Sequence, residues 1–503
     1  MNRRLLLIFV FLISLLPALY LTYLHTVDPF LYTPLSDISD AFSSGRLNAI
    51  STDQPTYILT LYTISSICNI APLQLAYLPI GALIFPFCIY ALARRIVGSR
   101  TIPILLILYF AFDISIYTGH FSVLAYAWAH PLFFIFILLY MMYSTSDKRN
   151  PSLIALILII FTSIVFLHPT YVFWAVSFAI ALNLLIAISK AVRLSNVKLI
   201  PTPFLTISLF AIYFGFNQIY FGFYIHRAIL IEPEIITEQF SNMVRSFLGF
   251  SAPLSTPYQM FVGAPTAVIG YATFARTLIL VSCILLGIVA WLKMHYRDFS
   301  KKFDNMLVIA TALLIAGMMH TIGYAAYGHI SMRFMILVFP IIAILLLKKV
   351  ELKKTMNVMV ALIIVLAFSQ TISYIAGGSE VNDIDVETVA SSDWLTSHTH
   401  GKVVFLSDFI TSQMTKFYFK NVGREVTQQF YSSELFSLIV TGDNKIASTE
   451  FVIVNMQMNW TSSTGWATFE PLKHYEVEIG ENVNLNKIYD DGIVTIFRST
   501  SFQ

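Results

Sequence analysis

The chain has 503 residues, of which 57% are hydrophobic and 12% charged, with a net charge of +3 at pH 7. Soluble domains carry about 25% charged residues, so this composition excludes a soluble globular protein and indicates a polytopic membrane protein. No glycine-rich phosphate loop, HExxH, CxxC or GxSxG motif is present and the three cysteines form no framework, which argues against an ATPase, a soluble nucleotide-binding transferase and a disulfide-built domain.

Apolar stretches recur along residues 1–376, and several of them, of about 18 to 22 residues, are long enough to cross a hydrocarbon core of about 30 Å as a helix. We expect about eleven spans, which makes this part an α-helical polytopic membrane domain. In chain order they are Leu5–Leu24, Leu73–Ala93, Ile102–Thr118, Ser122–Tyr143, Ser152–His168, Thr170–Ser189, Phe204–Tyr224, Thr277–Trp291, Met306–Tyr324, Arg333–Leu347 and Thr355–Ala376.

Lysine and arginine clusters fall in alternate loops, beginning with Arg3-Arg4 and Arg94-Arg95. The positive-inside rule places these loops in the cytoplasm. We therefore expect a multi-pass protein of the plasma membrane with a cytoplasmic N-terminus and an outer C-terminus. The first span lacks a clear cleavage site, so we interpret it as a retained anchor and not as a signal peptide.

Two outer loops are long, residues 25–72 and 225–276. The first begins with three carboxylates, Asp28, Asp37 and Asp40, and continues into Tyr57–Ile70, an apolar stretch too short and too close to its neighbour for a separate crossing. We expect an interfacial helix there, lying on the outer leaflet.

Hydrophobicity ends at Gly377-Gly378, and residues 377–503 have the pattern of a small extracytoplasmic α/β domain. The expected strands are Lys402–Leu406, Glu450–Asn455, Tyr475–Ile479 and Gly492–Phe497, and the expected helices are Asp385–Ser397 and Asp408–Tyr418. One glycosylation sequon, Asn459-Trp-Thr461, lies on the expected outer side.

Asp37 and Asp40 are three residues apart, so their carboxylates share one face if Pro34 opens a short helix. Such a pair can act as a general base or bind a divalent cation, although no ligand set defines a metal. The structural alternative is that Ser36 or Asp37 caps the helix and Asp40 favours the dipole of its first turn. Asp28 is a rival base or a hydrated loop residue.

Cationic and other ionisable side chains near the expected outer face are candidates for binding and support. Arg333 opens a late span from the outer side, and its planar fork suits a phosphate; the alternative is contact with lipid headgroups. Asp113 within the third span requires a partner such as Arg333, Arg276 or His120. The remaining candidates are Arg227, Glu232 and Arg245 of the second loop and His168, while we interpret His130 as a packing residue.

The order of these features resembles the GT-C glycosyltransferases, which include protein mannosyltransferases, aminoarabinose transferases and oligosaccharyltransferases. The resemblance covers nearly the whole chain in architecture, through short motifs. They are Asp37-Ile-Ser-Asp-Ala-Phe-Ser-Ser-Gly-Arg-Leu47, Asp53-Gln-Pro-Thr-Tyr-Ile58, Ala71-Pro-Leu-Gln-Leu75, Tyr90-Ala-Leu-Ala-Arg-Arg-Ile-Val-Gly98, Phe166-Leu-His-Pro169, Met332-Arg-Phe334 and the tail ending at Arg498.

The resemblance implies an enzyme that transfers a sugar from a polyprenyl-phosphate donor to a glycan, lipid or protein acceptor at the outer face, with no nucleic-acid partner. It implies that Asp37 is the base of an inverting displacement, with Asp28 as rival and Asp40 assisting. The leaving phosphate then requires a cation, for which Arg333 is the first choice and Arg227, Arg245 and Arg276 are alternatives.

The chain departs from the family in two respects, because the usual paired Asp-Glu and the tryptophan-rich tail motif of oligosaccharyltransferases are missing. Both departures argue against whole-oligosaccharide transfer and strict metal dependence. Two other function classes stay open: a transporter or flippase for a polyprenyl-linked lipid, and a non-catalytic scaffold of surface-glycan assembly.

Overall fold

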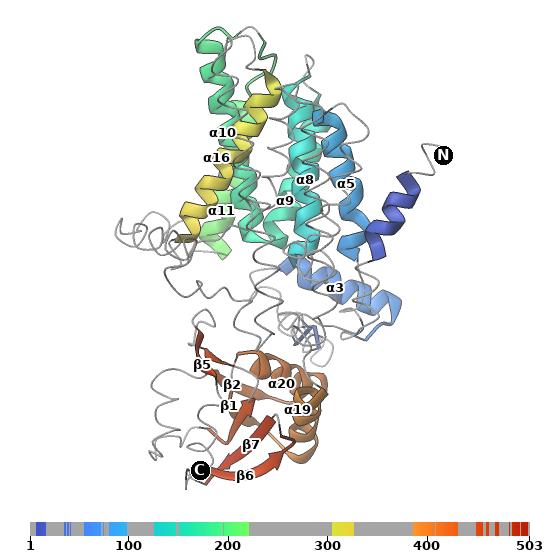
Figure 1. Cartoon of the computed structure of the whole chain (residues 1–503), viewed down its shortest axis with the longest axis vertical. Helices are drawn as coiled ribbons and strands as arrows, with labels where there is room; N and C mark the ends of the chain where they lie inside the picture. Colours follow the sequence, from blue (N-terminus) through green and yellow to red (C-terminus); the bar gives the residue numbers. More distant parts are fainter. Residues whose placement is uncertain are drawn as a thin grey trace, which may run out of the picture.

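A computed structural model gives the fold of the chain. It describes residues 7–16, 35–36, 38–39, 41, 55–71, 74, 80–97, 125–146, 150–194, 196–220, 304–325, 386–407, 409–430, 449–455, 459–461, 468–471, 482, 485–492 and 494–500. In these residues a bundle of apolar helices lies next to a smaller α/β unit formed by the C-terminal part of the chain (Figure 1). We call this unit the tail domain.

The helices of the bundle coincide with apolar runs of the sequence. Its members are α5 (Ile80–Val97), α8 (Ala125–Ser144), α9 (Pro151–Leu167), α10 (Pro169–Ala191), α11 (Pro203–Tyr220) and α16 (Asn305–Ala325). Among the described residues one helix, Tyr171–Ala191, is both long and apolar enough to cross a membrane, and six shorter apolar helices accompany it. The number of eleven spans stays a prediction.

Proline and polar caps set the ends of the central helices. Asn150 caps α9 by accepting a hydrogen bond from the backbone N–H of Ser152 at 3.0 Å, with Pro151 in the first turn. At the other end the extended backbone of His168 (φ −161°) ends α9, and Pro169 begins α10. Asp304 caps α16 by accepting from the backbone N–H groups of Met306 and Leu307. The break at His168 and Pro169 explains why the apolar runs of α9 and α10 become separate, closely packed helices.

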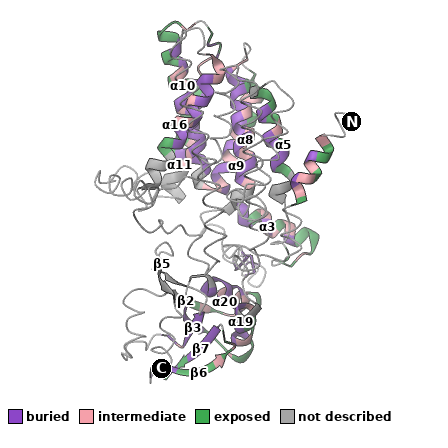
Figure 2. Ribbon diagram, in the orientation of Figure 1, coloured by how far each residue is buried: buried purple, intermediate pink, exposed green. Residues whose placement is uncertain are grey.

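The bundle buries one side of each helix and leaves large apolar side chains on the other (Figure 2). On α11, Phe204 is 77% and Ile207 63% exposed, and Phe210 and Phe214 continue the same stripe. On α10, Leu184 and Ile188 are also exposed. Extended apolar surfaces of this kind mark contacts with a membrane or with another protein.

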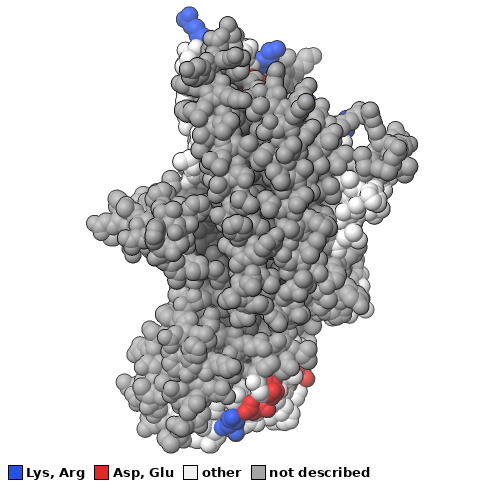
Figure 3. All heavy atoms as spheres, viewed as in Figure 1, with Lys and Arg blue, Asp and Glu red and all other residues white. Residues whose placement is uncertain are grey.

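The described basic residues of the bundle gather at its end away from the tail domain (Figure 3). Arg94 and Arg95 occupy the last turn of α5, and Lys190 the last turn of α10. Arg95 also donates a long hydrogen bond of 3.4 Å to the Thr145 hydroxyl just beyond α8. The distribution of charge therefore distinguishes a basic end of the bundle from a tail-side end.

The helix α3 (Pro55–Cys68) runs crosswise at the tail-side end of the bundle, close to α9 (Figure 1). It coincides with the expected interfacial helix. Tyr57, Ile58 and Leu61 are buried, whereas Leu59 and Ile67 are exposed. One side of α3 thus packs on the protein and the other side remains open.

The tail domain contains a five-stranded sheet with the strand order β2-β1-β3-β7-β6. Strands β1 and β2, and β1 and β3, are parallel, whereas β7 is antiparallel to both β3 and β6. The strands are β1 (Val403–Ser407), β2 (Val426–Phe430), β3 (Phe451–Asn455), β6 (Leu485–Asp490) and β7 (Val494–Ser499). A separate short hairpin joins β4 (Asn459–Thr461), which carries the sequon, to β5 (Thr468–Pro471).

Helices α19 (Val386–His398) and α20 (Phe409–Asn421) pack together and against the sheet (Figure 1). The core of the tail domain contains Leu395, Phe405, Phe419 and Ile453. These two helices and strands β1, β3 and β7 confirm the expected elements within one to three residues, but β2 and β6 were not expected. The expected strand Tyr475–Ile479 lies outside the described residues.

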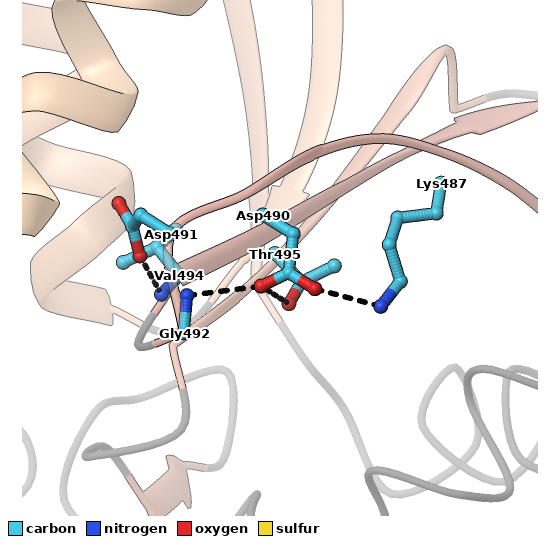
Figure 4. Close-up of polar contacts among 6 residues, drawn as sticks. All are labelled: Lys487, Asp490, Asp491, Gly492, Val494 and Thr495. Atoms are coloured by element: carbon cyan, nitrogen blue, oxygen red, sulfur yellow. Dashed lines mark hydrogen bonds and ion pairs between the residues drawn. The ribbon is translucent and has the colours of Figure 1, made fainter.

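The turn between β6 and β7 is built by two aspartates and a glycine (Figure 4). The Asp490 carboxylate accepts hydrogen bonds from Lys487 at 2.7 Å and from the backbone N–H of Gly492 at 3.0 Å, while Asp491 accepts from the N–H of Val494 at 2.7 Å. Gly492 has φ +90°, which a residue with a Cβ adopts only with strain. The hydrogen bonds to the Asp490 carboxylate hold its pKa below its usual value, and the bond from Lys487 has the largest effect.

Candidate functional site at the tail-side end of the bundle

The segment that the sequence predicts to be the first outer loop contains a short buried helical stretch. Leu35, Ser36, Ile38, Ser39 and Ala41 are helical, and each is at most 3% exposed. Leu35 and Ile38 belong to the large hydrophobic cluster of the bundle. The described positions are therefore consistent with the short helix that Pro34 could open. Asp37 and Asp40, which alternate with them in sequence, lie outside the described residues.

Three polar aromatic side chains meet where α8 begins and α9 passes into α10. The Tyr171 hydroxyl and Nε2 of His130 are 2.5 Å apart and hydrogen bonded. The rings of His168 and Tyr171 are nearly perpendicular, with their centres 5.3 Å apart. Tyr171 lies in the first turn of α10, two residues after Pro169, so the break between α9 and α10 positions its hydroxyl against α8.

Large aromatic side chains enclose this group. Tyr171 packs against Trp174 with ring centres 4.3 Å apart, and Phe133 contacts both rings. Phe85 of α5 contacts His130 from another side. Tyr171, Trp174, Phe133 and Phe85 are all buried, so the histidine–tyrosine hydrogen bond lies in a largely apolar environment, where it is stronger than in water.

The tail domain faces this end of the bundle with one side of α20. Met414 and Phe417 are buried in the same hydrophobic cluster as Leu35, Ile38 and Tyr171, and Tyr418 packs against that cluster. On the opposite side of α20, Phe419 belongs to the separate core of the tail domain. Helix α20 therefore joins the two parts of the protein. We call its contact with the bundle cluster the seam.

Buried polar atoms without a hydrogen-bond partner among the described residues occur both in the short helical segment and in α20. They are the hydroxyls of Ser36 and Ser39 and the amide oxygen of Gln413. Ser36 is 0%, Ser39 3% and Gln413 4% exposed. An unpaired buried polar group costs about 1–3 kcal/mol, so native proteins contain few of them.

Of the predicted site residues, the structure describes His168, which caps α9 beside Tyr171. The others lie outside the described residues: Asp28, Asp37, Asp40, Asp113, His120, Arg227, Glu232, Arg245, Arg276 and Arg333. Their roles stay predictions. His130, expected to be a packing residue, is buried and packs as expected, but it also forms the hydrogen bond to Tyr171.

The sequence reasoning missed Tyr171 and Gln413. Tyr171 follows His168 by three residues, a spacing that brings two side chains together on a helical turn, so this signal could have identified it. Gln413 lies in an expected helix without any motif, and its burial results only from packing of α20. Within the described part of the chain, no group of three or more His, Cys, Asp or Glu side chains is placed to hold a metal ion.

Comparison with solved structures gives a likeness to the apo form of the oligosaccharyltransferase from Archaeoglobus fulgidus. The TM-score is 0.53 and the identity 12%, over 90% of this chain and 69% of that chain. No protein-family model matches the sequence. No curated protein matches it either. At this identity the likeness establishes a fold similar to that of a GT-C glycosyltransferase, a class of membrane enzyme with which a helical bundle and an α/β tail are compatible.

Proposed function

We propose that the protein is a membrane glycosyltransferase that moves a sugar from a polyprenyl-phosphate donor to an acceptor hydroxyl at the outer face of the membrane. The observation that carries this proposal is the fold likeness over 90% of the chain to an enzyme of oligosaccharide transfer. Leu35 and Ile38, which flank Asp37 in sequence, support it, because both are buried in the hydrophobic cluster that runs through the bundle and includes Met414 and Phe417 of the tail domain.

The gathering of basic residues at the opposite end of the bundle supports the proposed orientation (Figure 3). Lysine and arginine accumulate on the cytoplasmic side of membrane proteins. The tail domain and the tail-side end would then face outward, with the N-terminus in the cytoplasm of a multi-pass plasma-membrane protein. The exposed apolar stripe of Phe204, Ile207 and Phe210 on α11 would contact lipid.

In the proposed reaction a carboxylate removes the proton of the acceptor hydroxyl while the bond between C1 of the sugar and the lipid phosphate breaks. Asp37 is the proposed base, with Asp28 as its rival and Asp40 assisting. Displacement from the opposite side inverts the configuration at C1. Negative charge accumulates on the departing phosphate, and a guanidinium that accepts this charge lowers the barrier. Arg333 is proposed for this role.

The direct test is transfer by the purified protein in lipid nanodiscs supplied with a polyprenyl-phosphate-linked sugar and an acceptor glycan, with products detected by mass spectrometry. Asp37→Asn should lower the rate at least about a hundredfold and leave binding of the lipid donor intact, because general-base catalysis contributes about 10²–10⁴-fold. The Arg333→Lys variant should be less active than the wild-type protein, because a lysine lacks the planar fork of arginine.

The matched control is Asp393→Asn, which changes an exposed aspartate of α19. It should transfer at the wild-type rate. Movement of the lipid across the bilayer without any glycosidic product would instead establish a flippase. A partner enzyme could instead need this protein for its own activity. If that activity is unchanged when this protein carries Asp37→Asn or Asp28→Asn, the protein is a scaffold.

A further inference from the structure

The described cations of the bundle lie at its end away from the tail domain (Figure 3). Arg94 and Arg95 end α5, whereas Lys190, Arg193 and Lys198 lie where α10 passes into α11. All five residues are exposed, and none of them forms an ion pair with another described residue. We call the connection that carries the last three residues the basic corner.

Carboxylates are scarce at this end of the molecule. Asp304 is the one acidic residue in the described part of the bundle. Its carboxylate accepts hydrogen bonds from the backbone N–H groups of Met306 and Leu307, at 3.2 and 3.3 Å, where α16 begins. The described cations of this end therefore outnumber its described carboxylate, and they leave a surface of net positive charge.

Arg193 has a backbone conformation that an arginine seldom adopts. Its φ is +59°, in the left-handed region, and the one other described non-glycine residue with a positive φ is Asn69, a type that tolerates it. The N–H groups of Arg193 and Leu194 donate to the carbonyls of Lys190 and Ser189 at 3.0 and 2.9 Å, a pattern that usually has glycine at this position. Arginine thus stands here in spite of backbone strain, which indicates a function for its charge.

The backbone of the basic corner is fixed beyond Arg193 as well. The N–H of Val197 donates to the carbonyl of Leu194 at 3.3 Å, so the two Cα atoms lie within about 7 Å of each other. Arg193 and Lys198 directly precede and follow these residues. The N–H of Lys198 also donates to the side-chain oxygen of Asn305 at 2.7 Å, which ties the corner to the start of α16. The cations therefore project from a held turn.

Large apolar side chains are exposed on both helices that meet at the basic corner. On α10 Ile188 is 57% and Val192 64% exposed, and the end of this helix is open to its surroundings (Figure 2). On α11 Phe204 is 77% and Ile207 63% exposed. A soluble anion would leave these side chains unmatched, and hydrocarbon alone would leave the cations unmatched. An amphiphile with an anionic head and hydrocarbon chains matches both.

We infer that the basic corner binds the phosphate groups of anionic phospholipids, in the leaflet that this end of the bundle faces. The planar guanidinium of Arg193 suits a phosphate, and Lys190 and Lys198 add charge beside it. The exposed apolar side chains of α10 and α11 contact the acyl chains. The inference goes beyond the proposed function, because it requires that the bundle lies in a membrane and not that the protein transfers a sugar.

The first test measures the Tm of the full-length protein in nanodiscs of phosphatidylcholine, with and without phosphatidylglycerol. Phosphatidylglycerol should raise the Tm of the wild-type protein. Native mass spectrometry of mixed micelles should show an affinity for phosphatidylglycerol that falls about fivefold in Lys190→Gln and in Lys198→Gln, as expected for one cation next to an anionic surface. Lys402→Gln is the matched control, because Lys402 is an exposed lysine of the tail domain, and its affinity should equal that of the wild type.

The second test separates the charge of Arg193 from its backbone strain. Arg193→Gly removes both, so in phosphatidylcholine alone its Tm should be higher than that of the wild type. With phosphatidylglycerol the variant should gain less than the wild type gains, because one cation is missing. Arg193→Lys keeps the charge, and its gain from phosphatidylglycerol should be close to that of the wild type.

The inference is wrong if phosphatidylglycerol and phosphatidylcholine stabilise the wild-type protein equally, a result that would favour an acidic protein partner for the basic corner. It is also wrong if the gain from phosphatidylglycerol is the same in Lys198→Gln, Arg193→Gly and Lys402→Gln. A third arm uses glycerol phosphate without lipid. An equal rise in Tm that depends on the same cations would show that the corner serves a soluble anion and not a lipid.

Discussion

The amide nitrogen of Asn183 in α10 donates a hydrogen bond of 2.7 Å to the phenol oxygen of Tyr140 in α8. Two threonines complete the group. Tyr140 is hydrogen bonded to the hydroxyls of Thr202 and Thr206 at 2.7 Å each, and the carbonyl oxygen of the Asn183 side chain accepts from the backbone N–H of Thr202 at 2.6 Å. One polar network thus fixes three apolar helices, α8, α10 and α11, in register.

Asn183→Ala should destabilise the bundle by about 1–3 kcal/mol, because it leaves the backbone N–H of Thr202 without an acceptor in an apolar environment. Thermal unfolding in detergent measures the effect. The control is Ser208→Ala, whose hydroxyl is exposed and bonded to a carbonyl of its own helix, and whose loss should change stability by less than about 0.5 kcal/mol. Equal Tm values for both variants would contradict the assigned network.

His130 and Tyr171 should show energetic coupling. Unfolding free energies of His130→Ala, Tyr171→Phe and the double variant form a double-mutant cycle, and we expect a coupling of about 1 kcal/mol for their hydrogen bond. His130→Ala combined with Ser391→Ala, in the tail domain, should be additive. A coupling near zero for the first pair would show that the two groups do not bond in the folded protein.

Cysteine labelling tests the proposed orientation of the helical bundle in a membrane. Cys68 at the end of α3 is exposed, whereas Cys88 within α5 is buried. A variant that keeps Cys68 and carries Cys88→Ser and Cys283→Ser should react with a membrane-impermeant maleimide in intact cells. Arg193→Cys in a background without other cysteines should react only after permeabilisation, because Arg193 lies at the basic end. The reverse pattern would contradict the proposed topology.

Asp490 and Glu450 should change the pH dependence of stability in opposite directions. The lowered pKa of Asp490, due mainly to Lys487, means that its carboxylate stabilises the fold above the unfolded-state pKa of about 3.9. This contribution is lost as the pH falls through the lower pKa of the folded state. Asp490→Asn should therefore reduce the free energy of unfolding of the tail domain at pH 7, by less than about 1 kcal/mol for so exposed a group, and have no effect in strong acid.

For Glu450, burial raises the pKa and the charge of Arg498 opposes this shift only partly. The favourable contribution of the neutral acid is present below about pH 4.3 and is lost as the pH rises through the raised pKa. Glu450→Gln should thus increase the Tm at pH 7 and bring no gain in acid. Unfolding of the full-length protein between pH 3 and pH 7 measures both variants, and a decrease at pH 7 for Glu450→Gln would show that its ion pair outweighs burial.

Local pattern determined most individual elements of this protein. Uninterrupted apolar runs predicted the helices of the bundle, and in the tail domain the apolar strands β1, β3 and β7 were found because their residues are buried throughout or nearly so. Strands β2 and β6 were missed, because the sequences VTQQF and LNKIYD are largely polar. Both lie at the edges of the sheet, where pairing with one neighbour, and not burial, makes them strands.

Only the tertiary structure decided which polar groups meet. Tyr171 and His130 are 41 residues apart in sequence, and Tyr140 and Thr206 are 66 apart, so no local spacing relates them. The unpaired Gln413 was equally invisible, since its burial depends on α20 lying between the tail core and the bundle cluster. The sequence alone determined the apolar character of the first 376 residues, the helix positions and an acidic segment after the first apolar run, because these follow from transfer free energies and backbone propensities of neighbouring residues. Contacts between distant segments depend on how whole helices pack, which no neighbouring residue specifies.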